Sequence, residues 1–335
     1  MRYLRPIAMT DAARPKGALP LAGGWCWFDR VEVLRRGAAG EVIAAVDCPD
    51  EDLERLCAPR VDFAGLSLDR PRIMGILNVT PDSFSDGGLF LDPQIAQAHA
   101  RGMTEAADII DIGGESTRPG AIEATDEEEL SRTVPVIAAL RAGGLQEVVS
   151  IDTRKAAVAE AALRAGADVV NDVSALGFDP DMGPLIAREG APVVLMHAQG
   201  APATMQDDPR YGDVLLDVYD ALAARIAAAE AFGIARSRIA VDPGIGFGKT
   251  SAHNLALIRG LSLFHGLGCP ILLGASRKRF IGSIGQAAEA SDRMPGSIAV
   301  ALAGVAQGVQ MLRVHDAAET RQALRLWAAM NGGEA

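Results

Sequence analysis

The 335-residue chain is long enough for one large domain with an appendage, and its 49% apolar content supports a sizeable core. Its 43 acidic residues outnumber 32 Lys and Arg, and the formal net charge of -11 repels nucleic acid and anionic membranes alike. We therefore expect no nucleic-acid partner and no membrane partner, and an anionic ligand must be held by a few local cations. The N-terminus lacks the apolar run of a secretory signal, so we expect a cytoplasmic protein.

Residues 1–70 are expected to form an N-terminal extension to which the sequence assigns no role. Their pattern predicts a strand around residues 25–34, a glycine turn, a second strand over 41–47 and a short helix over 51–56. We interpret the extension as an appendage that covers the bottom of the main domain or a dimer surface, with a separate binding module as the alternative. The four cysteines of the chain lack the spacing of a zinc site, so we expect reduced thiols.

Residues 71–335 alternate short apolar runs with segments rich in Ala, Leu, Glu and Arg, which is typical of alternating strands and helices. The eight runs are IMGILNV, ADIIDIG, EVVSIDT, ADVVNDV, APVVLMH, RIAVDPG, CPILLGAS and VQMLRVHD. Their continuous apolar character indicates a parallel sheet covered on both faces. Eight such units over about 260 residues match a closed (β/α)8 barrel, a TIM barrel, and we predict this α/β fold. An open doubly wound sheet is the alternative, although NVTPDS stands where its glycine-rich turn belongs.

The same pattern places the helices between the strands. We expect helices over residues 93–107, 126–141, 154–165, 213–232, 252–267 and 317–330. Thr125 with Glu128, and Asp316 with Glu319, fit capping boxes at two helix starts. The most hydrophobic window, GSIAVALAGVAQGVQMLRV, is interpreted as a buried helix followed by a buried strand rather than as a membrane span.

Polar residues follow the predicted strands, at the end where barrel enzymes have their active sites. In chain order they are Asn78, Glu115–Arg118, Asp152, Asn171, Met196, His197, Asp242, Ser276–Lys278, Arg313 and His315. Asn, Asp and Thr in such positions are also ordinary turn and cap residues. Because Asp152, Asn171 and Asp242 face the same rim of the predicted barrel, we interpret them as a binding set.

This set suits a flat heterocycle, because a carboxylate accepts two parallel N–H bonds and a carboxamide both donates and accepts. Without a cluster of histidines it is a poor catalytic zinc site, so we set metal-dependent hydrolysis aside. Arg313 and His315 lie between the last strand and a predicted helix start, which makes them a candidate anion site. A buried arginine paired with a carboxylate is the alternative for Arg313.

Several segments together resemble one enzyme family. They are MGILNVTPDSFSDGG, DIGGESTRPGA, SIDT, VNDVSAL, LMHAQG, DPGIGFGKT, LLGASRKRFIG and RVHD. In this order they resemble the dihydropteroate synthases, the folate-pathway transferases that sulfonamides inhibit. The resemblance runs from about residue 73 to the C-terminus, and the extension is longer than the leader typical of the family. It implies condensation of 6-hydroxymethyl-7,8-dihydropterin diphosphate with 4-aminobenzoate to 7,8-dihydropteroate and diphosphate, with Mg²⁺ as cofactor, by a homodimer.

The resemblance also implies roles for individual residues. The implied pterin-binding residues are Asp152, Asn171, Met196, Asp242, Gly274 and Lys278. The implied diphosphate-binding residues are Asn78, Thr117, Arg313 and His315, and Asn78 is also the implied metal ligand. The implied aminobenzoate contacts are Phe84, Thr117, Arg118, Pro119, Phe247 and Lys278. The implied catalytic set is Asp152, Asp242, Lys278, Arg313 and His315, with Asp86 either a member or a solvated turn residue.

Other interpretations stay open. His197 is interpreted as a structural, hydrogen-bonded residue rather than a general base, and Lys249 as part of a pocket-shaping loop or as a solvated charge. A methyltetrahydrofolate-type pterin-binding methyltransferase is an alternative function, but it needs neither the anion site nor the STRPG loop. A non-catalytic pterin-binding paralogue is not excluded by the residues.

Overall fold

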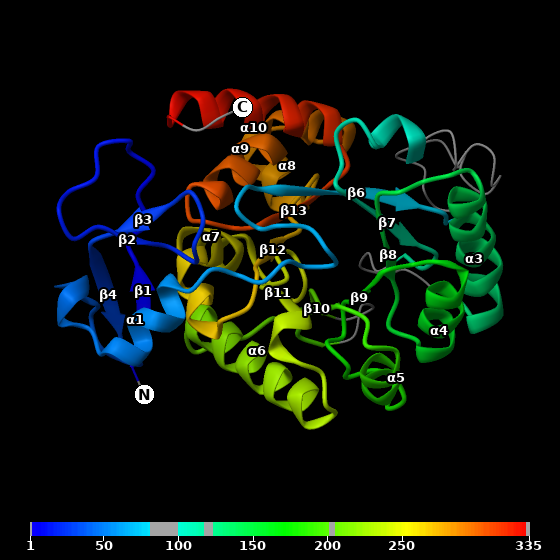
Figure 1. Ribbon diagram of the computed structural model, residues 1–335, viewed down its shortest axis with the longest axis horizontal. Helices are drawn as coiled ribbons and strands as arrows, with labels where there is room; N and C mark the ends of the chain where they lie inside the picture. The colour runs from blue at the N-terminus through cyan, green and yellow to red at the C-terminus, as the bar shows by residue number, and fades with distance from the viewer. Residues whose placement is uncertain (1, 81–99, 117–122, 201–204, 333–335) are drawn as a thin grey trace.

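The structure of the protein is a computed structural model that describes residues 2–80, 100–116, 123–200 and 205–332 (Figure 1). Five residues with predicted roles lie outside these ranges, namely Phe84, Asp86, Thr117, Arg118 and Pro119. Of the helix expected over residues 93–107, only the part from residue 100 onward is described.

Eight parallel strands form the central sheet (Figure 1). They are β6 (Arg72–Asn78), β7 (Ile109–Gly113), β8 (Val148–Asp152), β9 (Val169–Asp172), β10 (Val193–Met196), β11 (Ile239–Asp242), β12 (Leu272–Leu273) and β13 (Met311–Val314). Neighbours follow chain order from β6 to β11, and β13 pairs with both β12 and β6. A parallel bridge between Val241 and Ile271 joins β11 to the segment entering β12, which closes the ring. The predicted (β/α)8 barrel is confirmed.

Helices follow the strands and cover the outside of the sheet (Figure 1). The α-helices are α3 (Asp126–Ala142), α4 (Ala156–Ala165), α5 (Met182–Glu189), α6 (Val214–Ala231), α7 (Ser251–Arg259), α8 (Arg279–Gly285), α9 (Met294–Val305) and α10 (Ala317–Met330). Short 3-10 helices are η4 (Arg236–Arg238), η5 (Leu261–Leu267) and η6 (Ser291–Arg293). The single helix expected over 252–267 is wrong, because α7 ends before Gly260 and η5 takes its place.

The most hydrophobic window forms α9 followed by β13, as expected. In the described part of the chain, no helix combines the length and the apolar character that crossing a bilayer requires. The four cysteines, Cys26, Cys48, Cys57 and Cys269, are free thiols, in agreement with the prediction.

The capping box of Thr125 and Glu128 is confirmed, since each side chain bonds the backbone N–H of the other residue. The second predicted box is wrong. Asp316 makes no side-chain cap to α10, because its carboxylate accepts hydrogen bonds from the Arg277 guanidinium at 2.5 and 3.2 Å. A charged partner from a neighbouring loop thus replaces the local cap.

Strand pleating decides which side chains enter the barrel. One face of the sheet contributes Met74, Ile109, Val148, Val169, Val194, Ala240, Leu272 and Met311 to a single interior cluster. Their chain neighbours, such as Ile73, Ile110 and Val149, pack against the helices instead. Because side chains alternate along a strand, the residues two positions further on also face the interior, nearer the carboxyl ends of the strands. This set includes Asp111, Asn171, Met196, Asp242, Gly274 and Arg313.

The extension forms a three-stranded antiparallel sheet in the order β1 (Tyr3–Pro6), β4 (Arg30–Leu34), β5 (Glu41–Ala44). It also contains β2 (Leu19–Pro20), β3 (Trp27–Phe28), η1 (Ala45–Asp47) and α1 (Asp50–Cys57). β1 and α1 contact η5 at one side of the barrel (Figure 1). Ser262 Oγ of η5 donates to Pro6 O of β1 at 2.7 Å, and Trp25 Nε1 of the extension donates to Val305 O of α9 at 2.8 Å.

The last part of the extension closes the bottom of the barrel. Phe63 and Leu68 belong to the same interior cluster as the amino-terminal residues of the eight strands, and Phe63 is 1% exposed. Residues 63 and 66 form a small antiparallel bridge that holds this segment in a turn. The amino end of the barrel is therefore filled with apolar side chains, which leaves the carboxyl end for a binding site.

Candidate active site

A cavity of about 650 Å³ lies at the carboxyl ends of the strands. Its lining includes the predicted site residues Asn78, Asp152, Phe247, Gly274, Lys278, Arg313 and His315. They come from β6, β8 and β13 and from the loops that follow β11, β12 and β13. The barrel therefore brings together in space residues that are far apart in the sequence.

An ion-pair network lies beneath this cavity, centred on Arg313 of β13. Its Nε donates to Asp111 Oδ2 at 2.6 Å, and its Nη2 donates to Asp152 Oδ2 at 2.6 Å. Asn171 Nδ2 donates to Asp111 Oδ2 at 3.2 Å, so β7, β8, β9 and β13 each contribute one side chain. The alternative interpretation of Arg313, a buried cation paired with carboxylates, therefore describes its contacts in this structure, and its predicted anion role stays a prediction.

Burial and charge act against each other in this network. Burial raises the pKa of Asp152 to about 7; the charge of Arg313 opposes that rise, and the charge of Asp111 adds to it. Burial alone would lower the pKa of Arg313, but Asp111 and Asp152 raise it above its ordinary value. Arg313 is thus a permanent cation, and one of its two carboxylate partners takes up a proton more easily than an ordinary aspartate.

Asp111 is the residue that the sequence interpretation missed. It is fully buried in the middle of the apolar run ADIIDIG rather than at its end. Strand alternation could have identified Asp111, because it stands two residues after Ile109 and therefore on the interior face of the strand. A carboxylate there needs a buried cation, because an unpaired charge in the interior is costly.

The other predicted pterin residues lie deeper than the cavity lining. Asn171, Met196 and Asp242 are buried. Asp242 Oδ1 accepts a 2.7 Å hydrogen bond from Gly244 N. Burial raises the pKa of Asp242 to about 6, although that hydrogen bond and the charges of Lys278, Lys249 and Arg313 lower it. A Cβ at Gly274 would lie 3.3 Å from Asp242 Oδ2, so a side chain at position 274 would crowd this carboxylate.

Lys278 and Phe247 form one wall of the cavity. The Lys278 ammonium lies 3.9 Å above the centre of the Phe247 ring, within the range of a cation–π contact. Both residues were predicted to contact the same substrate, and the structure places them together although 31 positions separate them in the sequence.

His315 is tied to the neighbouring loop. Its Nδ1 lies 3.0 Å from Ser276 Oγ, and its backbone N–H donates to the same oxygen at 3.3 Å. The Arg277–Asp316 ion pair lies beside it and connects the same two loops. These contacts fix the loop after β13 against the loop after β12.

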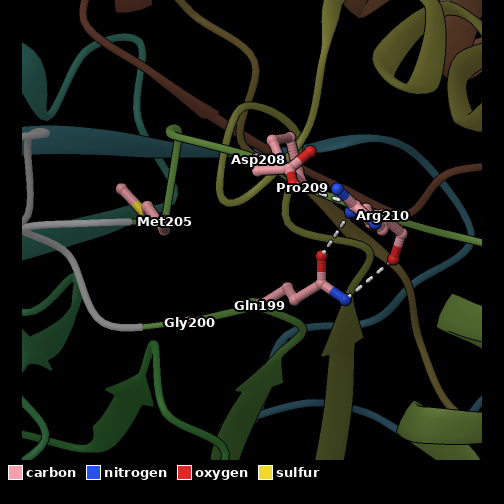
Figure 2. Close-up of a pocket in the computed structure, with 6 residues that line it drawn as sticks. All are labelled: Gln199, Gly200, Met205, Asp208, Pro209 and Arg210. Atoms are coloured by element: carbon pink, nitrogen blue, oxygen red, sulfur yellow. Dashed lines mark hydrogen bonds and ion pairs between the residues drawn. The ribbon is translucent and has the colours of Figure 1, made fainter.

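A second, smaller cavity of about 220 Å³ lies in the loop after β10. Figure 2 shows its lining residues, Gln199, Gly200, Met205, Asp208, Pro209 and Arg210. The Gln199 amide donates to Arg210 O at 3.0 Å and accepts from Arg210 N at 3.2 Å (Figure 2). None of the residues predicted from the sequence to bind substrate lines it, and its polar groups mainly hold the loop together.

The fold and the cavity together define a class of protein. This protein is a barrel with a cavity at its carboxyl end. Buried carboxylates that accept hydrogen bonds lie there, with a permanent cation beside them. Such a site suits an enzyme that binds a polar small molecule carrying both N–H donors and negative charge.

Comparisons with known proteins agree with this class. Residues 74–315 match the model of the family described as pterin binding enzyme. A dihydropteroate synthase from Neisseria meningitidis serogroup B is 48% identical over 271 residues, covering 79% of this chain and 94% of the relative. The structure of the Yersinia pestis dihydropteroate synthase in a sulfonamide drug complex has a TM-score of 0.77 and 45% identity, covering 80% and 97% of the two chains. That of the Xanthomonas albilineans enzyme with 4-aminobenzoic acid has a TM-score of 0.75 and 47% identity, covering 81% and 98%.

The chain belongs to the pterin-binding enzyme family and, within it, to the dihydropteroate synthases, which are transferases of folate synthesis. The family, the fold class and the enzymatic function predicted from the sequence are therefore confirmed. The extension lies outside the matched segment, which begins at residue 74.

Proposed function

We propose that the cavity above Arg313 is where this chain joins 6-hydroxymethyl-7,8-dihydropterin diphosphate to 4-aminobenzoate, releasing diphosphate. The pair of Asp152 and Arg313 carries the proposal: a carboxylate that can accept ring N–H groups and a cation that can meet phosphate oxygens lie 2.6 Å apart. The 4-aminobenzoic acid and the sulfonamide drug in the two related structures support an arylamine as the second substrate.

The pterin ring is proposed to bind in the deep part of the barrel. Its 2-amino-4-oxo edge presents parallel N–H donors, which the carboxylate of Asp152 or Asp242 can accept, and the Asn171 amide both donates and accepts. These side chains are largely buried, so a ligand without matching groups leaves them unpaired and binds poorly. The interior set of side chains therefore selects the pterin.

Arg313 and His315 are proposed to bind the diphosphate. The bond between the pterin methylene carbon and the diphosphate oxygen breaks, and its electron pair leaves with the diphosphate. The electron-rich ring stabilises the positive charge left on the methylene group. The arylamine nitrogen then attacks this carbon and loses a proton to the departing diphosphate or to water. Cations already held in place stabilise charge as it develops on the leaving group, and one such group contributes about 3 kcal/mol.

We propose Mg²⁺ as cofactor, with Asn78 as its protein ligand. Asn78 lines the cavity with a neutral amide oxygen. Within the described ranges, no group of three or more His, Cys, Asp or Glu residues that could hold a metal occurs. This suits Mg²⁺, which keeps several waters and binds through one or two protein oxygens plus substrate phosphates. When bound, the ion would neutralise charge on the diphosphate.

The aminobenzoate ring is proposed to pack against Phe247 and Lys278, whose cation–π contact forms a rigid apolar and positive wall. The contacts predicted for Phe84, Thr117, Arg118 and Pro119, and the catalytic role predicted for Asp86, remain predictions. Homodimer formation and a cytoplasmic location also remain predictions.

The test is product formation. Purified protein is incubated with both substrates and Mg²⁺, and 7,8-dihydropteroate is separated by chromatography; we expect product from the wild type and at least about a hundredfold less from Arg313→Met. Arg101→Met, a substitution of an exposed arginine away from the cavity, is the matched control. Tight pterin binding without any product would contradict the proposal and favour a non-catalytic paralogue.

A further inference from the structure

Lys249 is a buried lysine to which the proposed reaction gives no role. It is 3% exposed, and its ammonium lies inside the loop that follows β11. Its Nζ donates to Gly244 O and to Phe247 O, both at 2.9 Å, and lies 2.9 Å from His197 Nδ1. Burial lowers the pKa of Lys249 to about 7, although the charge of Asp242 raises it. In its protonated form Lys249 has three N–H donors, and these acceptors, together with His197 O at 3.3 Å, take up all of them.

His197 acts as the acceptor in this cluster. Burial and the neighbouring charge of Lys249 lower the pKa of His197 to about 3, so the imidazole is neutral. Its Nδ1 faces a donor, which places the imidazole proton on Nε2. His197 N also donates to Asp242 O at 2.9 Å. Lys249 and His197 therefore tie the end of β10 to the loop after β11.

The loop held by Lys249 can follow its path only with glycines. Gly244, Gly246 and Gly248 have φ of +67°, +83° and +60°, in the left-handed region. A Cβ at Gly244 would lie 1.8 Å from His197 O, so the two backbones are in direct contact. This path turns the carbonyls of residues 244 and 247 toward Lys249, and without an ammonium these carbonyls lose a donor.

The loop carries one wall of the cavity. Phe247 lies within it, and the Lys278 ammonium rests 3.9 Å above the Phe247 ring. A Cβ at Gly246 would lie 3.1 Å from Lys278 Cδ, so the stem of Lys278 packs along the same loop. The position of Phe247, and with it that of Lys278, therefore depends on the peptide whose carbonyl Lys249 holds.

We propose that Lys249 is a positioning residue for the second substrate: from inside the loop it fixes the Phe247–Lys278 wall against which the arylamine packs. The inference rests on the proposed function for the identity of that substrate. Lys249 is among the residues that line the cavity, but its donors are taken by the loop and by His197, so it acts through Phe247 and not on the reacting atoms. Its loss therefore affects binding of the arylamine more than binding of the pterin substrate.

The test is a double-mutant cycle between Lys249→Met and Phe247→Leu, read as the KM for each substrate at saturation with the other. We expect Lys249→Met to raise the KM for 4-aminobenzoate about tenfold and to change the KM for the pterin diphosphate less than about threefold. The reason is that Phe247 is predicted to contact only the aminobenzoate, whereas the pterin keeps its interior partners Asp152 and Asn171. In the Phe247→Leu background, Lys249→Met should raise the KM for 4-aminobenzoate by less than a further factor of about three, because both changes disturb one wall. Lys16→Met, at an exposed lysine of the extension, is the matched control and should change neither KM.

Equal increases in both KM values, or effects that multiply in the double variant, would overturn the inference. If Lys249→Met does not fold, two variants of His197 test the inference instead. His197→Phe removes one acceptor and should raise the KM for 4-aminobenzoate, whereas His197→Asn places an amide oxygen near the Nδ1 position and should restore most of it. If neither differs from the wild type, the inference is wrong.

Failure of the proposed function would be visible separately, as wild-type protein that makes no 7,8-dihydropteroate. Calorimetric titration of the same variants with 4-aminobenzoate would then decide the inference. Weaker binding by Lys249→Met and Phe247→Leu, with no further loss in the double variant, would support it. Unchanged binding would refute it.

Discussion

Arg313 of β13 donates a 2.6 Å hydrogen bond to Asp152 of β8, across the interior of the barrel. The same carboxylate is proposed to accept N–H groups of the pterin ring, and the same guanidinium is proposed to meet the diphosphate. The proposed sites for the two halves of one substrate therefore share an ion pair, so a substitution of one partner should also change how the other binds its half of the substrate.

Arg313→Ala is expected to weaken binding of 6-hydroxymethyl-7,8-dihydropterin diphosphate far more than binding of the free pterin. The guanidinium is the buried permanent cation beside the proposed diphosphate position, and the pterin edge has other partners. Calorimetry with both ligands gives the two dissociation constants, and we expect the ratio of the constant for the diphosphate substrate to that for the free pterin to rise by at least about tenfold. Equal losses for the two ligands would refute the anion role of Arg313.

Asp111→Asn keeps the size of the side chain and the hydrogen bond from Asn171 but removes the charge that holds Arg313 Nε. We expect turnover to fall about tenfold, because the guanidinium loses the negative charge of one of its two partners, and pterin affinity to change less than about threefold. Steady-state kinetics and calorimetry measure the two effects. Asp126→Asn, at an exposed aspartate of α3, is the matched control and should change neither quantity. Turnover equal to that of the wild type would show that Asp152 alone positions Arg313.

Pterin binding is expected to weaken at acid pH. The pKa of Asp242 is raised to about 6 by burial, so its carboxylate is ionised above that pH and takes up a proton below it. The ionised form is proposed to accept the ring N–H groups, so affinity should fall as the pH drops through about 6, in addition to a loss below about 7 from Asp152. Titrations between about pH 5 and pH 8 measure this loss, which Asp242→Asn should reduce. An identical pH dependence in wild type and variant would assign the titration to another group.

The raised pKa of Asp242 also affects stability, but in the opposite direction: its contribution is larger at low pH. The pKa of Asp242 is higher in the folded protein than the ordinary aspartate value of 3.8, so the folded state binds this proton more tightly. The contribution of Asp242 to stability therefore decreases as the pH rises from about 4 to about 6. In Asp242→Asn this decrease should be absent, which urea unfolding at several pH values would measure.

Phe63→Ala is expected to destabilise the protein by about 3 to 5 kcal/mol, because it opens a cavity in the apolar cluster that closes the amino end of the barrel. Val61→Ala is the matched control: Val61 is 62% exposed, and this change should cost less than about 0.5 kcal/mol. Chemical denaturation monitored by Trp fluorescence compares the two. Equal stability of both variants would show that the segment does not support the barrel.

Much of the fold followed from local patterns. Each of the eight predicted strands is present, because continuous β-branched runs between helical segments are typical of a covered parallel sheet. The cap at Thr125 was also predictable, since both partners lie within one turn of the chain. The helix over 252–267 was not, because its apolar residues continue past Gly260 although the α-helix ends there.

The order of strands and helices, and the residues at the strand ends, could be predicted from the sequence alone, because both depend on neighbours a few positions apart. Which of these residues contact one another follows from the tertiary structure. Asp111 with Arg313, Asp316 with Arg277, Phe63 with the barrel interior and Lys249 with His197 are contacts between distant parts of the chain. Barrel closure and strand register bring Asp111 to Arg313, because a shift of one residue would turn either side chain to the opposite face of the sheet. The other three contacts depend on the paths of loops at the two ends of the barrel, which local patterns do not fix.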